Sequence, residues 1–548
     1  WVVAAGAFVG VAFLTKMLQA LLVVPAFALV YMVAAPTSVR TRIVHILAGA
    51  AAIVVSAGWW VAIVELWPAS SRPYIGGSQN NSVLELIFGY NGFGRLTGNE
   101  TGSVGGGMGN GGGRWGATGW GRMFQASWSG QIAWLIPAAL LAVVVGLVIS
   151  RRAGRTDRLR SAIIIWGGWL VVTMLTFSFG QGIIHEYYSV ALAPPIGALV
   201  AIVGRELWIR RDDLYARITM AAGVVITAFT ARSILGHATD WHPWLSSLVI
   251  VVGLGAAALL IAGDSWHARA RTLTVTGALA AMLIAPTAYS LQTASTAHTG
   301  SIPTAGPQVA GGMGGPGGGG RGGPGGRLPG GTGSQSQQGA LGGPPGTGSQ
   351  SQQGGTGSQS QQGFGGPPGM GSWSQQGGSG GASSTPGATG GSSATGSSSS
   401  GWSRSRGGLG GFGGGGGGAG GLLQAGPPSD AVVSALTENA DQYTWVAAAV
   451  GSNSAAGFQL ASEKPVMAIG GFNGSDPSPT LAEFKELVAQ GKIHWFIGGG
   501  GGMGGGQQGG SSASQDIRSW VSENFTAQTI GNTTMYDLTA PVTSSTAG

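Results

Sequence analysis

Apolar runs of spanning length recur along the first 291 residues of the chain, and short polar connections separate most of them. About 20 helical residues cross the hydrocarbon core of a bilayer, so each run predicts a membrane-spanning helix. The predicted spans are residues 17–35, 43–63, 132–150, 161–179, 187–204, 218–235, 245–263 and 272–291, preceded by a truncated span at residues 1–14. Because the chain begins inside an apolar run, at Trp1, we expect further residues ahead of it.

Arginine is concentrated in every second connection between these spans. The basic connections are residues 40–42, 151–160, 205–217 and 264–271, whereas residues 181–186 and 236–244 contain neither Lys nor Arg. Basic short loops remain in the cytoplasm. The pattern therefore predicts a multi-pass protein of the cell membrane, with an extracytoplasmic side made of residues 64–130, 181–186, 236–244 and everything after residue 291.

The overall composition combines two kinds of sequence, long apolar segments with few charges and a Gly-rich tract with few apolar residues. Glycine supplies 106 of the 548 residues, charged residues only 9%, and hydrophobic residues 43%. This balance excludes a soluble enzyme of uniform composition and a coiled coil, and the net charge of +7 is too scattered for a nucleic-acid-binding face. Because cysteine is absent, disulfides, thiolate catalysis and zinc–cysteine sites are also excluded.

These patterns divide the chain into three regions. They are a multi-spanning membrane domain at residues 1–291 with an outer loop at 64–130, a Gly/Ser/Gln/Pro-rich linker at 292–426, and an extracytoplasmic α/β domain at 427–548 with a Gly-rich insert at 498–510. The linker repeats the segment GTGSQSQQG and has few apolar residues. It cannot bury enough surface to offset chain entropy, so we predict that it is disordered.

The last region alternates short apolar runs with helical patterns. Buried strands are predicted over YTWVAAAV, PVMAIGGF and KIHWFIGG, and helices after Ser429 or Asp430, after Ser478 or Thr480, and over QDIRSWVSENF. This alternation is typical of a small α/β domain with a largely parallel sheet. His494 lies inside the third strand, where we interpret it as a packed residue rather than a catalytic one.

Two groups of ionisable residues lie at the outer ends of predicted spans. Lys16 occupies a turn between two spans. The second group opens a later span and consists of His185, Glu186, Tyr187 and Tyr188. An ammonium with imidazole and phenol donors suits a phosphate at the bilayer surface. Two alternatives remain open, namely Lys16 as a snorkelling interfacial cation and the second group as a polar loop that caps two helices.

The outer loop combines hydrogen-bonding and aromatic side chains with a segment at 82–90 that is predicted to form a short interfacial helix. These side chains are Arg72, Tyr74, Gln79, Asn80, Asn81, Tyr90, Asn91 and Arg95. They suit a polyhydroxylated ligand at a membrane surface. The alternative is an ordinary solvated loop.

Several segments resemble the GT-C-fold glycosyltransferases of family 39, which use polyprenyl-phosphate sugars and include protein mannosyltransferases. These segments are FLTKMLQALLVVPAFALVYMVAA and HEYYSVALAPPIGALVA. The outer loop RPYIGGSQNNSVLELIFGYNGFGRLTG resembles that of the actinobacterial branch. The C-terminal mannosyltransferase domain of that branch is similar to three segments here, YTWVAAAVGSNSAAGFQLAS, KPVMAIGGFNGSDPSPTLAEF and KIHWFIGGGGG. The expected fold is therefore a GT-C-like helical membrane protein, truncated at its start, with a disordered linker and a small C-terminal α/β domain.

The resemblance implies an inverting transfer of a sugar, with mannose expected, from a polyprenyl-phosphate donor to an extracytoplasmic protein, glycolipid or wall-polymer acceptor. It assigns the donor phosphate to four residues, Lys16, His185, Tyr187 and Tyr188. Arg72 and Tyr74 are further candidates for substrate contact. The resemblance places the catalytic base, an aspartate, in an outer loop ahead of Trp1. No cofactor, metal or nucleic-acid partner is expected.

Two other functions remain open from the sequence. One is a transporter of lipid-linked precursors, which predicts charged residues deep within the spans or paired broken helices in matching halves. The other is a non-catalytic, wall-associated binding protein whose working end is the α/β domain. The sequence leaves open the sugar, the acceptor, the role of the α/β domain and the oligomeric state.

Overall fold

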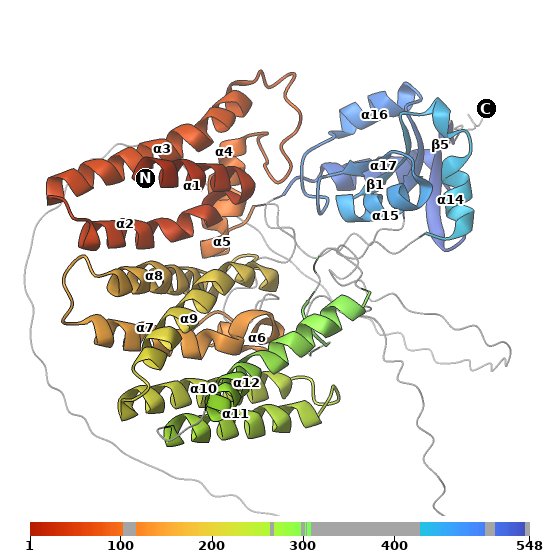
Figure 1. Ribbon diagram of the computed structural model, residues 1–548. Helices are drawn as coiled ribbons and strands as arrows, with labels where there is room; N and C mark the ends of the chain where they lie inside the picture. Colours follow the sequence, from red (N-terminus) through yellow and green to blue (C-terminus); the bar gives the residue numbers. More distant parts are fainter. Residues whose placement is uncertain are drawn as a thin grey trace, which may run out of the picture. The chain divides into compact units, whose positions relative to one another are not determined.

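The structure is a computed structural model, and it describes residues 1–101, 117–263, 268–297, 302, 304–307, 309, 428–498 and 510–542. Most of the predicted linker, the Gly-rich part of the outer loop and nearly all of the insert predicted at 498–510 lie outside the described residues. The described part is helical up to Ser295 and α/β from Asp430 to Pro541 (Figure 1). The predicted fold class, a helical polytopic membrane protein with a small C-terminal α/β domain, is confirmed.

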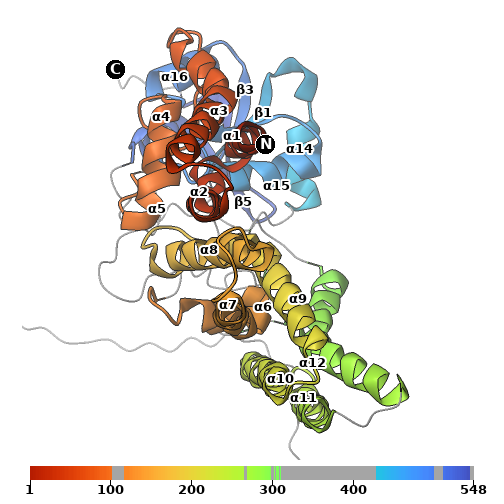
Figure 2. The same cartoon turned by 60° about the vertical axis from the view of Figure 1, so that its left-hand side comes forward.

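Eight segments of the described residues are long and apolar enough to cross a membrane. The long helices are α1 (Val2–Lys16), α2 (Val24–Ala34), α3 (Val39–Leu66), α7 (Ile136–Ser150), α8 (Arg158–Phe179), α9 (Ala193–Ile209), α10 (Leu214–Leu235), α11 (Trp244–Ala262) and α12 (Ala268–Ser295). Shorter elements are η1 (Met17–Val23), α4 (Val83–Glu85), η2 (Leu86–Phe93), α5 (Gly94–Thr97), η3 (Arg122–Phe124), α6 (Ala126–Ile132), η4 (Ala133–Leu135) and η5 (Glu186–Leu192). Figures 1 and 2 show three neighbouring groups, α1 to α3, α6 to α9, and α10 to α12.

The first spanning segment, Val2–Ala34, is broken into two helices at Lys16 and Met17. The first of them, α1, packs against α3, where a Cβ on Gly6 would lie 2.2 Å from the carbonyl oxygen of Gly49. Only glycine permits so close an approach of two helix backbones. The second helix, α2, packs instead against α8. The truncated span and its successor are therefore separate helices, as the sequence predicted.

Large apolar side chains fill the centre of the bundle and are fully buried. They include Trp128, Ile136, Leu170, Leu192 and Leu199, from α6, α7, α8, η5 and α9. Lipid tails are as apolar as these side chains, so close packing rather than the hydrophobic effect holds membrane helices together.

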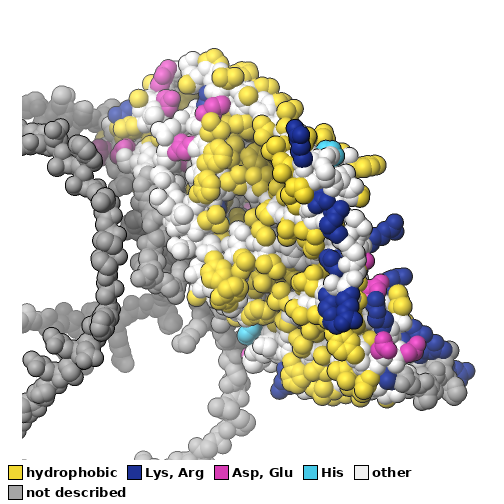
Figure 3. All heavy atoms as spheres, turned by 90° about the vertical axis from the view of Figure 1, so that its left-hand side faces the viewer, with side chains coloured by type: hydrophobic (Ala, Val, Ile, Leu, Met, Phe, Trp, Pro, Cys, Tyr) yellow, Lys and Arg dark blue, Asp and Glu magenta, His cyan; other side chains and the backbone are white. Residues whose placement is uncertain are grey.

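The connections gather at two ends of the bundle. At one end the indole of Trp241 donates to the side-chain oxygen of Gln292 at 3.1 Å. At the other end Arg155 donates to the carbonyl oxygen of Ala35 at 2.7 Å. Figure 3 shows a broad hydrophobic surface with Lys and Arg side chains gathered along one edge. A predicted outer loop, residues 236–244, thus meets the end of α12 at one end, and the basic connection 151–160 meets the end of α2 at the other.

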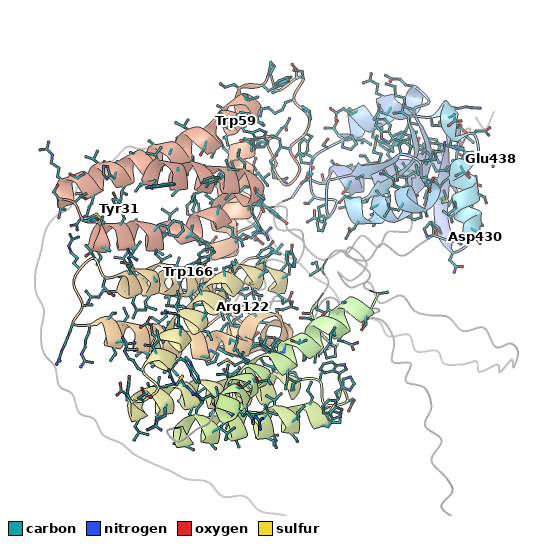
Figure 4. All side chains as sticks on the ribbon, viewed as in Figure 1. Tyr31, Trp59, Arg122, Trp166, Asp430 and Glu438 are labelled. Atoms are coloured by element: carbon teal, nitrogen blue, oxygen red, sulfur yellow. The ribbon has the colours of Figure 1, made fainter. Side chains whose placement is uncertain are left out.

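A buried arginine closes one end of α8. Arg122 is 1% exposed, and its Nη1 donates to the carbonyl oxygens of Phe177 at 3.0 Å and Gly180 at 2.6 Å. Its guanidinium lies 5.0 Å from the ring centre of Trp128, between α6 and α8 (Figure 4). The last carbonyls of a helix lack intrahelical partners, and the cation supplies one. Burial lowers the pKa of Arg122 to about 10, against the effect of the nearby Glu186, so the side chain is charged at neutral pH.

The C-terminal region forms one mixed sheet with helices on it. Its elements are α14 (Asp430–Thr437), η6 (Ala440–Gln442), β1 (Trp445–Val450), α15 (Ser452–Ser462), β2 (Val466–Ile469), α16 (Leu481–Ala489), β3 (Ile493–Ile497), α17 (Ala513–Asn524), β4 (Phe525–Ile530) and β5 (Thr533–Pro541). The strand order is β2-β1-β3-β5-β4, with the first three parallel and the last two antiparallel to their neighbours. The three predicted strands are therefore present and parallel, whereas the antiparallel pairings of β5 make the sheet mixed rather than largely parallel.

Two details of this domain bear on the sequence predictions. The helix α15 was not predicted, because its small and polar residues give a weak apolar pattern. His494 is 8% exposed in β3 and stacks on Tyr443 with ring centres 4.3 Å apart, which agrees with its interpretation as a packed residue.

We predict that Arg122→Met lowers the stability of the bundle by on the order of 3 kcal/mol, because buried carbonyls and the Glu186 carboxyl lose a charged partner. Thermal unfolding in detergent measures the effect. Arg158→Met is the matched control, since Arg158 is exposed at the opposite end of the same helix. Equal unfolding temperatures for the two variants would contradict the capping role.

Candidate functional site

Lys16 is the last residue of α1. The next residue, Met17, adopts a φ of 43°, a backbone conformation that residues with side chains rarely occupy. Such conformations cost of order 1–3 kcal/mol and are found most often at functional sites. The turn ends α1 at the membrane face where Lys16 meets the start of η5.

An aromatic cluster receives the Lys16 ammonium. Its Nζ lies 4.1 Å from the ring centre of Tyr188 and 5.4 Å from that of Tyr187. The His185 ring stacks on Tyr187 at 5.5 Å and meets Tyr188 edge-on at 5.4 Å. Both lysine distances fall within the range of cation–π attraction. The structure thus brings together all four residues that the sequence assigned to a phosphate, although they lie about 170 positions apart.

The charge of Lys16 is not neutralised within the described part of the chain. No carboxylate there lies within ion-pair distance of its ammonium, whereas Arg95 forms an ion pair with Glu100 at 3.0 Å. Tyrosine rings attract a cation but do not cancel its charge. The ammonium can therefore bind an anionic ligand without first leaving a carboxylate partner.

His185 is held in its neutral form. Burial, together with the smaller effects of the positive charges of Arg95 and Lys16, lowers its pKa to about 4. A neutral imidazole carries one N–H donor and one acceptor nitrogen. At neutral pH the side chain can therefore donate one hydrogen bond to a ligand without adding a charge.

A second cation, Arg95, shares a cavity with Lys16. The cavity has a volume of about 300 Å³, and its lining includes Lys16, Asn91, Arg95, Thr176 and Tyr188. Arg95 belongs to α5, which follows the helical turns α4 and η2 where the sequence predicted a short interfacial helix. Its guanidinium lies 4.5 Å from the ring centre of Tyr90.

An apolar groove leads to the same lysine. It has a volume of about 610 Å³, runs along α1 and η1 to Phe27 of α2, and is also lined by residues such as Phe8, Val9 and Trp169. Groove and cavity have four lining residues in common, namely Thr15, Lys16, Gln19 and Leu22. Lys16 thus lies where a hydrocarbon-lined groove meets a cavity with two cations.

The other two candidates are placed elsewhere. Arg72 donates to the carbonyl oxygens of Glu65 and Asn81, each at 2.6 Å. The Tyr74 hydroxyl donates to the carbonyl oxygen of Ser78, and burial raises its pKa to about 12. Both side chains hold the outer loop together, and their contact with a substrate stays a prediction.

The described residues contain no group of three His, Cys, Asp or Glu side chains arranged to hold a metal ion. What the arrangement offers chemically is a cavity lined by two cations and the Tyr188 phenol, with the neutral imidazole of His185 in ring contact with Tyr188. Sequence reasoning named Arg95 among the polar residues of the outer loop but did not select it. It did not identify Glu100, because the contacts of Glu100 with Arg95 and Ile183 depend on folding.

The comparisons with known proteins that found a match all found sequences described as "putative mannosyltransferase". Residues 432–524 match the family model described as "Putative mannosyltransferase YkcB-like, C-terminal". The chain is 27% identical to "Putative mannosyltransferase YkcB" of Bacillus subtilis (strain 168) over 619 residues, covering 96% of this chain and 69% of that protein. It is 28% identical to "Putative mannosyltransferase YycA" of the same organism over 397 residues, covering 58% of this chain and 57% of that protein. No solved structure matches the chain significantly.

The low pKa of His185 predicts a specific pH dependence of stability. The pKa of His185 is about 4 in the folded protein and about 6.5 in the unfolded chain. As the pH falls from about 6.5 towards 4, the unfolded chain binds a proton that the folded protein does not, so the fold loses stability. Thermal unfolding at pH 7.5 and 5.0 should therefore show a smaller loss for His185→Gln than for the unaltered protein. The exposed His242 provides the control variant His242→Gln, which should behave like the unaltered protein. An identical loss in all three would show that His185 is not buried in neutral form.

Proposed function

The chain belongs to a GT-C-like mannosyltransferase family, and on that premise we propose that it transfers mannose from a polyprenyl-phosphate donor to an extracytoplasmic acceptor. The family relation and the eight apolar helices make it a glycosyltransferase-like membrane protein. The polyprenyl donor, the inverting course and the orientation in the membrane belong to the proposal. The acceptor class is a protein, a glycolipid or a wall polymer.

The position of Lys16 carries this proposal. A polyprenyl phosphate has a long apolar tail and an anionic head, and Lys16 lies between an apolar groove and a cationic cavity. In the proposed complex the tail occupies the groove along α1 and α2, and the phosphate meets the ammonium. Hydrocarbon in a membrane groove replaces hydrocarbon of similar polarity, so the charged contact provides most of the selectivity.

The proposed reaction is a single displacement. An acceptor hydroxyl oxygen attacks the anomeric carbon from the face opposite the phosphate, and the bond between that carbon and the phosphate oxygen breaks. The bonding electron pair stays on the phosphate, and the hydroxyl proton passes to a carboxylate base. The family resemblance assigns the role of this base to an aspartate.

The residues around the cavity act on the leaving group. The phosphate becomes more negative as the bond breaks, so fixed cations stabilise the transition state more than the bound donor. Lys16 and Arg95, which both line the cavity, supply these charges. His185 is neutral and offers a hydrogen bond, and Tyr187 and Tyr188 hold the ammonium in place through their rings.

We predict that Lys16→Ala lowers sugar transfer by roughly 100-fold, the loss typical of one group that stabilises developing charge. The assay is transfer of radiolabelled mannose from polyprenyl-phosphate-mannose in membranes that contain the protein. Arg232→Ala is the control, because Arg232 is an exposed cation near the predicted outer end of α10. Unchanged turnover in Lys16→Ala would remove the phosphate assignment.

The proposed orientation has a direct test, since the chain contains no cysteine and each single substitution introduces one thiol. Thr239→Cys lies in a predicted outer loop and Thr156→Cys in a basic one, and both threonines are exposed. A membrane-impermeant maleimide should label the first in intact cells and the second only after permeabilisation. The reverse result would place Lys16 on the cytoplasmic side.

A further inference from the structure

Glu100 is a completely buried carboxylate next to the proposed phosphate site. Its side chain has no solvent exposure, and its Oε1 lies 3.0 Å from Nη1 of Arg95. Both carboxylate oxygens accept from the backbone N–H of Ile183, each at 3.0 Å. The same Arg95 Nη1 donates to the carbonyl oxygen of Ile183 at 2.8 Å. We call Arg95, Glu100 and Ile183 the clamp.

The clamp joins two loops that are far apart in the sequence. Backbone bonds extend it, because Gly182 N donates to the Arg95 oxygen at 3.0 Å and Gln181 N to the Leu96 oxygen at 3.1 Å. A Cβ at Gly182 would lie only 2.6 Å from Oε1 of Glu100, so the two loops leave no space for a side chain there. Two residues after Ile183 the chain reaches His185, which is part of the aromatic cluster.

Arg95 has a second side that Glu100 does not occupy. Its side chain is 15% exposed, lies against the Tyr90 ring and lines the cavity that Lys16 also lines. Burial is the main cause of the lowered pKa of His185, and the positive charge of Arg95 is the second cause. This agrees with a position of the Arg95 charge close to the aromatic cluster. The clamp therefore fixes Nη1, while Nη2 donates to Oδ1 of Asn91 at 3.3 Å, and Arg95 and Asn91 both line the ligand cavity.

A buried ion pair of this kind is poorly explained by stability alone. Removing two charges from water costs about as much as their attraction returns, so buried pairs often add nothing to the free energy of unfolding. Burial raises the pKa of Glu100, and the Arg95 charge and the Ile183 N–H oppose that rise. What the pair does provide is geometry, since two donors meet the two oxygens of one carboxylate.

We propose that Glu100 is a positioning residue, which holds Arg95 as a second cation opposite Lys16 at the phosphate of a polyprenyl donor. This inference rests on the proposed function of the same site. The bound donor is a phosphodiester with one negative charge, whereas the released polyprenyl phosphate is a monoester with a second ionisable oxygen. One cation matches the donor, and a second, correctly placed cation matches the leaving group.

The test measures binding of a polyprenyl monophosphate to the purified full chain in detergent, with the corresponding uncharged polyprenol as the control ligand. The variants are Glu100→Gln, Arg95→Gln and the double variant. Glutamine has the size of glutamate but no charge, and it carries an NH2 donor in place of one of the two oxygens that accept from Ile183, so the charge-assisted bond to Arg95 is lost. Thermal unfolding of each variant is measured alongside.

We expect each single variant to bind the monophosphate roughly tenfold more weakly, the loss typical of one charge-assisted hydrogen bond, while polyprenol binding stays unchanged. If Glu100 acts through Arg95, the double variant should be no weaker than Arg95→Gln alone. A purely structural role would instead give additive losses and would weaken polyprenol binding as well.

Three results overturn the inference. They are equal or tighter monophosphate binding by Glu100→Gln, additive losses in the double variant, or equal losses for the monophosphate and the polyprenol. If a glutamine variant does not fold, Gly182→Ala disturbs Glu100 from the backbone side without changing any charge, and it should weaken monophosphate binding in the same way. Failure of the unaltered protein to bind the monophosphate at all would instead refute the proposed function.

Discussion

A lysine ammonium at the edge of the hydrocarbon core is unfavourable unless another group interacts with its charge. In the described residues Lys16 has two tyrosine rings close by and no carboxylate within ion-pair distance. The buried carboxylate Glu100 is instead bound to Arg95 and the backbone of Ile183. The site therefore keeps a positive charge at a membrane face, and the surrounding elements are arranged to hold that charge in place.

Several segments that are far apart in the sequence hold the site in place. The turn at Met17 ends α1 at the lysine, and η5 brings the aromatic residues to it. The clamp fixes the loop that leads into η5, and Arg122 closes the end of α8 from which that loop starts. Rigid support of this kind matters because electrostatic stabilisation of a leaving group depends on donors that need not reorganise during the reaction.

The proposed phosphate site lies in the membrane domain, which is one part of the protein. The chain covers 69% and 57% of the lengths of the two relatives. The α/β domain matches the family model but has a packed core of its own around residues such as Phe484 and Phe496.

Local patterns were sufficient for much of this description. Spans, basic connections and the alternation of strands and helices are repeated over neighbouring residues, so the sequence alone predicted the membrane bundle and the α/β sheet. It also drew attention to Lys16 and to His185, Tyr187 and Tyr188, because polar residues at span ends are conspicuous in an apolar background. The weak apolar pattern of α15 shows where such reasoning stops.

Only the tertiary structure decided which of these residues meet. Arg95 and Glu100 reach Ile183 across 88 and 83 positions, and Arg122 reaches Phe177 across 55, through contacts that no local pattern encodes. The groove and the cavity at Lys16 are likewise spaces between helices rather than properties of any segment. Periodicity records which face of an element is buried, whereas a buried polar contact depends on which two loops the packing of the helices brings together.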